Sequence, residues 1–237
     1  MDRSDKSVTV PLSKYIDNLE DDTKFMYDKL KQKGLKMLHL NIRSLLRNID
    51  EVKLLLTQNI VHIFSVNETW LDESVSNDEI NIDGFRVVRK DRNRNGGGIA
   101  IYIRNDLNFK VLEHISLNNL EALPLLIGTN HAKPFVFVSW YRPPNSPICI
   151  FDYYEELLVF LDNFHHDIII MGDINCDIKK LPLTNNTKRL NEINTVFSLQ
   201  QINVTTHTRI SGDSLSLIDH MVSLEMVKSY GVIYIPE

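Results

Sequence analysis

The sequence predicts an α/β protein built on buried β-strands, and two stretches carry this prediction. Residues 36–66 have the pattern of strand, helix and strand, and a βαβ unit of this size places its two strands parallel in one sheet. Residues 168–171 form a run of apolar residues that is typical of a strand buried on both faces. The run leads into Gly172-Asp173-Ile174-Asn175, so polar side chains follow a rigid strand.

The end of this second stretch has residue types that phosphodiester cleavage needs. Gly172 allows the backbone to turn sharply, and Asp173 and Asn175 point the same way, because side chains in an extended chain repeat every two residues. Asp173 can exchange a proton, and the Asn175 amide can hold an oxygen in place. Plain turn chemistry is the alternative, because strand-Gly-Asp also occurs in ordinary turns.

Length and composition suit one sizeable domain or a domain with an appendage: the chain has 237 residues, 43% of them apolar. No stretch approaches the roughly 18 apolar residues that span a bilayer, and the charged N-terminus has no signal-peptide pattern. The two cysteines, Cys149 and Cys176, do not indicate a disulfide framework or a zinc site. We therefore expect an intracellular protein, in nucleus or cytoplasm, with no membrane partner.

Residues 1–34 differ from the rest and form a charged N-terminal lead-in. Apolar residues recur there at helical spacing, among many charged ones: Ile16, Leu19, Met26 and Leu30. A loosely ordered lead-in helix and a partner-binding helix are the two interpretations. Residues 35–237 form the predicted domain.

The first βαβ unit brings two polar residues to one edge. The strand 36–42 is followed by apolar residues at helical spacing and by a buried strand over 60–66. Asn41 and Glu68 therefore leave the same ends of neighbouring parallel strands, where open α/β sheets keep their sites.

A hairpin is expected next, with strands over 85–89 and 99–103 around the glycines of residues 96–98. Its turn is basic, and three arginines are candidates to contact the backbone of a nucleic acid: Arg89, Arg92 and Arg94. A solvated hairpin tip is the alternative. The net charge of −5 counts against non-specific coating of nucleic acid but allows such a local basic face.

Further strands and helices complete the α/β pattern. Strands are expected over 123–127 and 135–140, and the second ends at Tyr141, because prolines at 143 and 144 forbid continued pairing. Helical spacing predicts helices over 151–161 and 187–197, the latter with Thr187 as a possible N-cap.

Polar residues thus end five separate apolar strands: Asn41, Glu68, Tyr141, Asp173 with Asn175, and Asp219. A hard cation such as Mg²⁺ prefers oxygen ligands of this kind, together with water and substrate phosphate. No Cys/His cluster competes for a softer metal, and His39, His62, His165 and His166 have no metal-ligand spacing. No Ser-His or Cys-His pair and no P-loop is present, which argues against acyl transfer and P-loop NTP hydrolysis.

The segments "LHLNIRSL", "NETWLD", "DGFRVVRKDRNRNGGGIAIYI", "WYRPPN", "IIIMGDINCD", "THTR" and "SLSLID" resemble the endonuclease domain of LINE-type, non-LTR retrotransposons. That domain belongs to the endonuclease/exonuclease/phosphatase superfamily, with the apurinic/apyrimidinic endonucleases and DNase I. The match runs in order from Leu35 to Val222. It implies a four-layered α/β sandwich in which two packed mixed sheets are flanked by helices.

The resemblance implies a role for each matched residue. Glu68 would hold Mg²⁺, with Asn41 close to the metal and the phosphate. Asp173 would handle the proton of the attacking water or the leaving oxygen, and Asn175 would orient the phosphate. Tyr141 would hydrogen-bond the charged phosphoryl group.

The remaining matched residues would face the DNA or support the chemistry. Thr208 and Ser216 would lie near the DNA strand, and Asp219 would orient a catalytic histidine. The implied reaction nicks one DNA strand and leaves a 3′-hydroxyl that primes reverse transcription, with a reverse transcriptase domain in the parent element. Stabilisation of the developing phosphate charge would supply much of the catalysis.

The sequence departs from the family pattern at its end. In the family the catalytic histidine lies in a Ser-Asp-His motif well after the acid matched by Asp219, and the sequence ends at Glu237, about where that motif would begin. We therefore expect a C-terminally truncated domain that lacks the last core strand, with Asp219 orienting nothing. General acid–base groups contribute about 10²- to 10⁴-fold in rate, so activity would be weak or absent.

His220 does not replace that histidine, because no serine directly precedes Asp219. We expect it to be packed or at the surface and to face away from the side of the strand that carries Asp219.

Three functions remain open from the sequence. The first is a Mg²⁺-dependent DNA endonuclease of the retrotransposon type, weak or inactive. The second is a non-catalytic remnant that binds DNA or a protein through the basic hairpin at 86–94. The third is a superfamily phosphatase that acts on a lipid or small-molecule phosphate.

Overall fold

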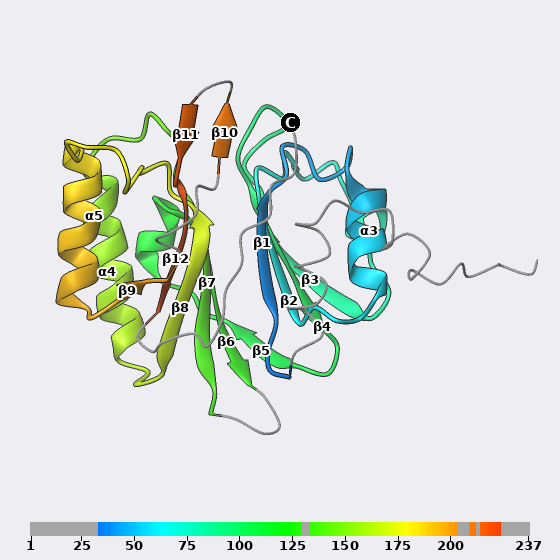
Figure 1. Ribbon diagram of the computed structural model, residues 1–237. Coiled ribbons are helices and arrows are strands. Elements are labelled where there is room, and N and C mark those ends of the chain that lie inside the picture. The colour runs from blue at the N-terminus through cyan, green and yellow to red at the C-terminus, as the bar shows by residue number, and fades with distance from the viewer. Residues whose placement is uncertain (1–32, 129–132, 203–208, 212–213, 224–237) are drawn as a thin grey trace, which may run out of the picture.

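The computed structural model describes residues 33–128, 133–202, 209–211 and 214–223. Nearly all of the charged lead-in, together with Thr208, lies outside these ranges. Two β-sheets pack face to face, with helix α3 against the outside of one and helices α4 and α5 against the outside of the other (Figure 1). The predicted sandwich of two mixed sheets between helices is thereby confirmed.

The first sheet contains the predicted βαβ unit and hairpin, in the order β1-β2-β4-β3. Strand β1 (Met37–Asn41) pairs in parallel with β2 (Ile63–Asn67), so that Asn41 lies opposite Asn67. Strands β3 (Phe85–Lys90) and β4 (Ile99–Arg104) form the antiparallel hairpin, and β4 also pairs with β2.

The second sheet has the order β5-β6-β7-β8-β12-β9. Among its described strands, β7 and β8 are the only neighbours that pair in parallel. Its strands are β5 (Asn108–Val111), β6 (Glu121–Gly128), β7 (Phe135–Tyr141), β8 (Asp167–Asp173), β9 (Gln200–Gln201) and β12 (Asp219–Ser223). A separate two-stranded ribbon and two 3₁₀ turns complete the described elements: β10 (Arg209–Ser211), β11 (Ser214–Ser216), η1 (Asp78–Ile80) and η2 (Ile115–Asn118).

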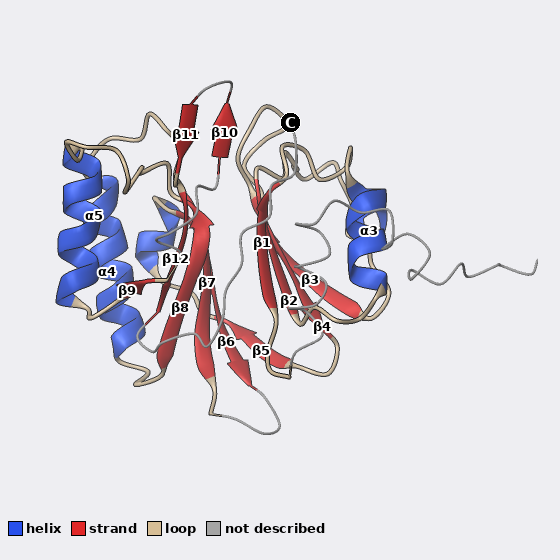
Figure 2. Cartoon of the chain, in the orientation of Figure 1, coloured by secondary structure: helices blue, strands red, loops and turns tan. Residues whose placement is uncertain are grey.

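Helices of the described part of the chain cover the outer faces of both sheets, as Figure 2 shows. Helix α3 (Ile49–Thr57) buries Val52 and Leu56 against the first sheet. Helices α4 (Ile150–Asp162) and α5 (Asn185–Val196) pack on the second sheet. None of the helices in the described ranges is long and apolar enough to cross a membrane.

The predicted N-cap of α5 is wrong. Thr184, which has an extended backbone, caps the helix by accepting a hydrogen bond from the Thr187 amide at 3.2 Å. Thr187 already lies in the first turn and is buried. A capping residue needs non-helical backbone angles, and the local sequence offered two threonines without indicating which one has them.

The buried strands alternate between two environments, because successive side chains of a strand point to opposite faces. In β2, Phe64 and Val66 pack with α3. Ile63 belongs to the core between the two sheets, and Ser65 and Asn67 lie on this same inner face two and four residues further along. The inner face therefore changes from apolar to polar along the strand.

The same gradient runs along the facing strands of the second sheet. In β7, Phe135 and Phe137 join the inter-sheet core and Ser139 follows them. The Ser65 hydroxyl donates to the Ser139 hydroxyl at 2.6 Å, and the Asn67 amide donates to it at 3.2 Å. These bonds satisfy polar groups buried between the sheets. The apolar end of the interface holds the sheets together and the polar end leads to a site.

Candidate active site

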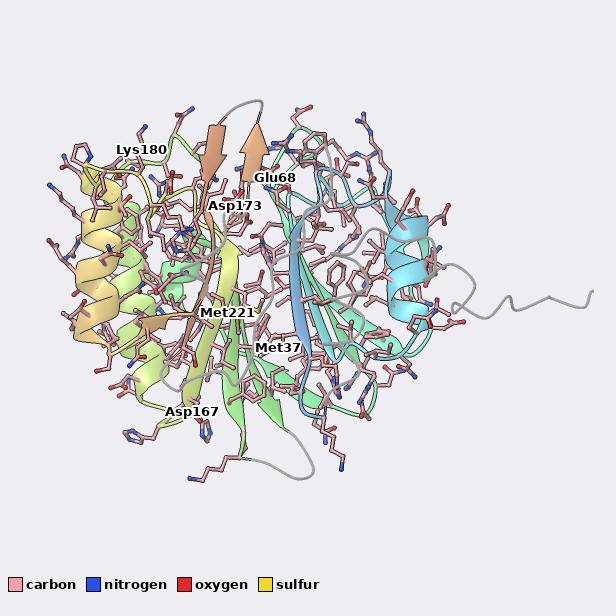
Figure 3. All side chains as sticks on the ribbon, in the orientation of Figure 1. Met37, Glu68, Asp167, Asp173, Lys180 and Met221 are labelled. Atoms are coloured by element: carbon pink, nitrogen blue, oxygen red, sulfur yellow. The ribbon has the colours of Figure 1, made fainter. Side chains whose placement is uncertain are left out.

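The polar residues predicted at the strand ends meet at one edge of the sandwich, called here the site rim. The rim is where β1, β2, β7 and β8 end and where β12 begins. Figure 3 shows Glu68 and Asp173 near one another at this edge, with Asp167 at the opposite edge. Met37 and Met221 lie between the two edges, on either side of the interface between the sheets.

Two hydrogen bonds join residues across the rim. The Asn41 amide of the first sheet donates to Asp173 Oδ2 of the second sheet at 2.8 Å. The Tyr141 hydroxyl of the second sheet donates to Oε1 of Glu68, which follows β2 of the first sheet. Four of the candidate residues are therefore connected in pairs at the rim, although they come from distant parts of the chain.

Glu68 is held by three hydrogen-bond donors. Its Oε2 accepts from the Gly97 amide at 2.9 Å and from the Trp70 indole at 2.6 Å, while its Oε1 accepts from Tyr141. Burial by itself would raise the pKa of Glu68, but the bonds from Tyr141, Gly97 and Trp70 together hold the pKa below its ordinary value. Glu68 is therefore ionised at neutral pH.

The backbone at Glu68 is shaped for this position. Its φ of 58° is left-handed, and so is the φ of 53° at Trp70. Non-glycine residues in this region cost free energy and concentrate at functional sites. The chain then pairs with the glycine turn, because the Trp70 amide donates to Gly97 O at 3.0 Å. The strained turn thus presents the Glu68 carboxylate to the rim.

The glycines at 96–98 are required by space as well as by conformation. Gly97 and Gly98 have φ of 68° and 86°. A Cβ on Gly97 would lie 2.4 Å from the Arg92 guanidinium carbon, and one on Gly98 would lie 2.4 Å from Thr69 Oγ1. Only glycine lets the turn close this tightly around the Glu68 carboxylate.

Asp173 has the opposite electrostatic setting. Its side chain is buried. Its oxygens accept from the Asn41 side-chain amide and from the backbone N–H of Asn175, the latter at 3.1 Å. Burial, and next the nearby carboxylate of Asp219, raise the pKa of Asp173 to about 7. Asp219 is its register partner on β12. Asp173 can therefore exchange a proton near neutral pH.

Two expectations about this strand end are wrong. Gly172 does not make a turn but lies inside β8, where an added Cβ would be 1.7 Å from Trp140 O of β7. The extended chain stops at Asp173, and Asn175 has a left-handed φ of 52°. Strand alternation therefore does not make the Asn175 side chain point the same way as that of Asp173. The side-chain amide of Asn175 donates to Arg142 O at 2.9 Å.

Asp219 has a histidine beside it that the sequence analysis did not assign. His39 Nε2 lies 3.7 Å from Asp219 Oδ1, and His39 Nδ1 lies 3.2 Å from Ser65 Oγ. An imidazole of β1 therefore faces Asp219, but 3.7 Å is longer than a hydrogen bond, and the expectation that Asp219 orients no histidine stays a prediction. His220 is buried, as expected for a packed residue, and its Nε2 lies 2.8 Å from Cys176 O.

The three arginines of the basic hairpin differ in their surroundings. Arg89 donates to Val75 O at 2.5 Å, and Arg92 donates to Gly96 O at 2.9 Å. Arg94 is exposed. Of the other residues expected near DNA, Ser216 is half-buried at the end of β11 and Thr208 lies outside the described residues. Contact with DNA stays a prediction for all of them.

Several site residues were not predicted from the sequence, although strand alternation indicated the position of some of them. Ser65, Asn67 and Ser139 precede the rim residues on the same inner faces, so strand alternation was the available signal. The Asp173 amide donates to Asn67 Oδ1 at 2.9 Å, which fixes the two sheets to one another. Arg142 is fully buried and donates to Ile174 O and Ser146 O at 3.3 and 3.0 Å, and no local pattern indicated this.

The oxygen atoms at the rim fit a hard divalent cation. Among the described residues, no group of three or more His, Cys, Asp and Glu side chains is placed to hold a metal. Mg²⁺ commonly uses only one or two carboxylates, with water and substrate phosphate as its other ligands. Asn41 Oδ1 is buried and makes no hydrogen bond to a described residue, so it is available as a further oxygen ligand beside the ionised Glu68.

Comparison with known proteins places this rim in a family. The model of the endonuclease/exonuclease/phosphatase family matches residues 38–223, from β1 into β12. The chain belongs to this family. Family members are hydrolases that include nucleases and phosphatases, and its nucleases generally use divalent metal ions. No curated protein matches the sequence significantly.

Solved structures from the family share the fold over most of their length. The endonuclease domain of TRAS1, a telomere-specific non-LTR retrotransposon, has a TM-score of 0.61 at 18% identity, covering 80% of this chain and 84% of that domain. The AP endonuclease LMAP from Leishmania major has a TM-score of 0.64 at 13% identity, with coverage of 91% and 90%. A mannosyl-6-phosphatase from Bacteroides thetaiotaomicron has a TM-score of 0.55 at 12% identity, with coverage of 80% and 85%.

These identities show the fold, and one fold hosts several activities. The superfamily to which the sequence motifs pointed is confirmed. The assignment to LINE-type elements within it stays a prediction, because nucleases and a phosphatase match similarly well.

Proposed function

We propose that this chain is a Mg²⁺-dependent DNA endonuclease of the non-LTR retrotransposon type, which nicks one strand and leaves a 3′-hydroxyl. One observation supports a phosphodiester hydrolase above all: two carboxylates at one rim have pKa values shifted in opposite directions. Such a pair divides into a charged ligand and a group that exchanges a proton. The ordered motifs from "LHLNIRSL" to "SLSLID" support the retrotransposon type.

The surroundings of each residue determine whether it would bind the cation or accept a proton. Glu68, kept ionised, and Asn41, through its buried Oδ1, would hold the cation. When bound, Mg²⁺ supplies Lewis-acid stabilisation of the charge that develops on the phosphate. Asp173, with a pKa of about 7, accepts the proton of the attacking water.

Tyr141 serves as a hydrogen-bond donor in this scheme. Burial, and next its bond to Glu68, raise the pKa of Tyr141 well above its ordinary value of 10, so the phenol stays protonated. A phenol has one proton to donate. Tyr141 therefore holds Glu68 before substrate binds and must release it to donate to a phosphate oxygen.

The test is nicking of supercoiled plasmid by the full chain, with Mg²⁺ or with EDTA. We expect Mg²⁺-dependent conversion to open circles whose ends a DNA polymerase extends without phosphatase treatment. Glu68→Gln should lower the rate of conversion by about 10²-fold or more, whereas Glu73→Gln should retain it, because Glu73 is an exposed acid of the same loop. Nicking by Glu68→Gln at the wild-type rate would contradict the proposal.

The same preparation separates the other two functions. DNA binding that weakens with salt, with no cleavage under any metal condition, would indicate a binding protein instead. Hydrolysis of a small phosphomonoester in the absence of plasmid nicking would indicate a phosphatase. Either result would overturn the endonuclease proposal.

A further inference from the structure

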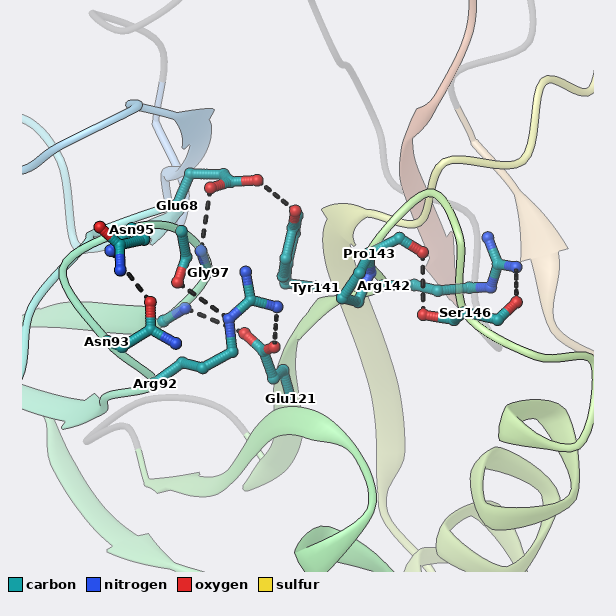
Figure 4. Close-up of polar contacts among 12 residues, drawn as sticks. Glu68, Arg92, Asn93, Asn95, Gly97, Glu121, Tyr141, Arg142, Pro143 and Ser146 are labelled. Carbon is teal, nitrogen blue, oxygen red and sulfur yellow. Dashed lines mark hydrogen bonds and ion pairs between the residues drawn. The ribbon is translucent and has the colours of Figure 1, made fainter.

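Glu121 contacts the glycine turn from outside the predicted site. It is the first residue of β6, and register places it opposite Tyr141 of β7. Its Oε2 accepts from the Gly98 amide at 2.9 Å, and its Oε1 accepts from Arg92 Nη1 at 2.7 Å (Figure 4). Its side chain is 18% exposed. Glu121 therefore ties the second sheet to a turn of the first.

Arg92 completes the attachment from within the turn. Its Nε donates to Gly96 O at 2.9 Å while its Nη1 binds Glu121. Its guanidinium carbon lies 5.7 Å from the centre of the Tyr141 ring, which is within cation–π range. Figure 4 shows the Arg92 guanidinium beside Glu121 and Tyr141.

The turn needs such an attachment, because its glycines carry no side chains of their own. Gly97 supplies the amide that holds Glu68, and its neighbours Gly96 and Gly98 are the two points fixed by Arg92 and Glu121. Glycine loses more conformational freedom on ordering than any other residue. Anchoring both neighbours of Gly97 therefore orders the amide that orients the carboxylate.

We propose that Glu121 and Arg92 form a positioning clamp that sets the cation affinity of Glu68. The inference rests on the proposed function and assigns Arg92 to the turn, not to the DNA backbone. Neither residue touches the reacting atoms, so both act through the Gly97–Glu68 bond. Partners of this kind behind a metal ligand typically contribute about 10- to 100-fold in metal affinity.

Substitution of Arg92 distinguishes the clamp from a purely electrostatic effect, because the two predict opposite changes in cation affinity. Electrostatics alone predicts that removing its positive charge strengthens cation binding, because like charges repel. The clamp predicts the reverse, because Gly97 loses its anchor. Mg²⁺ binding to the full chain, measured by calorimetry without DNA, should weaken by about 10-fold or more in Arg92→Ala and in Glu121→Ala.

Conservative variants keep the test valid if an alanine variant does not fold. Arg92→Lys keeps the charge but not the fork of donors, and Glu121→Gln keeps the shape but not the charge. Both should fold and fall between the wild type and the alanine variants in Mg²⁺ affinity. Glu113→Gln removes an exposed acid shortly before β6 and should bind Mg²⁺ as the wild type does.

DNA binding without metal separates the clamp from a phosphate contact. Arg94→Ala, at another exposed arginine of the same turn, should weaken metal-free DNA binding and leave Mg²⁺ affinity unchanged. Arg92→Ala should show the opposite pattern. Wild-type or tighter Mg²⁺ binding by Arg92→Ala and Glu121→Ala would overturn the clamp.

Glu68→Ala distinguishes failure of the clamp from failure of the proposed function. If Glu68→Ala loses Mg²⁺ binding while both clamp variants retain it, only the clamp is wrong. If Glu68→Ala binds Mg²⁺ as tightly as the wild type, both the proposed function and the clamp are wrong.

Discussion

Glu68 and Asp173 occupy the same rim but differ in what surrounds them. Glu68 is half-buried in a loop and accepts three hydrogen bonds. Asp173 is nearly inaccessible at the end of a strand, accepts two, and has Asp219 as a neighbour. Burial raises the pKa of both carboxyls. At Glu68 the donors outweigh burial, whereas at Asp173 the donors lower the pKa too little to offset burial and the carboxylate of Asp219.

The difference teaches that the balance between burial and hydrogen-bond donors decides the role of each acid, with a neighbouring carboxylate as a further contribution. A carboxylate with enough donors remains charged and can attract a cation, whereas one facing a second carboxylate keeps its proton to higher pH. If the two acids were interchangeable, substitutions at them would have the same consequences. The following predictions test whether they do.

The largest effect is expected from Asp173→Asn. The amide has the shape of the carboxyl group, and its oxygen can still accept from the backbone N–H of Asn175, so the fold should be retained. The proton acceptor is lost, and plasmid nicking should fall by about 10²- to 10⁴-fold. The Mg²⁺ affinity, measured by calorimetry, should change much less than the rate, and a loss of both in parallel would make Asp173 a cation ligand.

Glu68→Gln should lower the nicking rate by about 10²- to 10³-fold, a loss typical of removing one stabilising group. Gln can keep its oxygen toward Gly97 and Trp70 and its amide toward Tyr141, so the fold is retained and the charge is lost. In contrast to Asp173→Asn, the variant should require much more Mg²⁺ for half-maximal rate. An unchanged Mg²⁺ requirement would break the distinction between the two acids.

Tyr141→Phe should have a smaller effect, because Glu68 keeps its bonds from Gly97 and Trp70. Losing one donor moves the pKa of Glu68 upward, toward its ordinary value. Mg²⁺ binding should therefore weaken more at pH 5 than at pH 8, as calorimetry at the two pH values would show. The nicking rate at saturating Mg²⁺ should fall about tenfold if Tyr141 also donates to the phosphate.

The smallest effect concerns stability. The pKa of Asp173 is about 7 in the folded chain against an ordinary value of 3.8, so the folded state keeps its proton over a range where the unfolded state has released it. The stability that Asp173 contributes is fully present below pH 3.8 and is lost as pH rises through 7. Asp173→Asn cannot titrate and escapes this loss.

Thermal unfolding across this range provides the measurement. The Tm of Asp173→Asn should match that of the wild type near pH 4 and exceed it at pH 8, with about 2–4 °C for each kcal/mol recovered. Asp162→Asn, an exposed acid at the end of α4, should show no such pH-dependent difference. A gain that shrinks as pH rises would reverse the assigned direction of the Asp173 shift.

The sequence determined the elements and much of the site, because both depend on local periodicity. Alternation in β2 and β7 marks which residues face inward, and the βαβ unit alone places Asn41 and Glu68 at one edge. Residue type then limited the chemistry to oxygen ligands and proton exchange, since the strand ends carry carboxylates and amides.

Only the tertiary structure decided how these groups act on one another. Asn41 and Asp173 are 132 positions apart, and Glu121 reaches the glycine turn from another sheet. The His39–Asp219 pair and the close approach of Gly172 to Trp140 also join separate strands. Charge, hydrogen bonding and steric contact act through space, and a periodic pattern along the chain does not record which strands become neighbours.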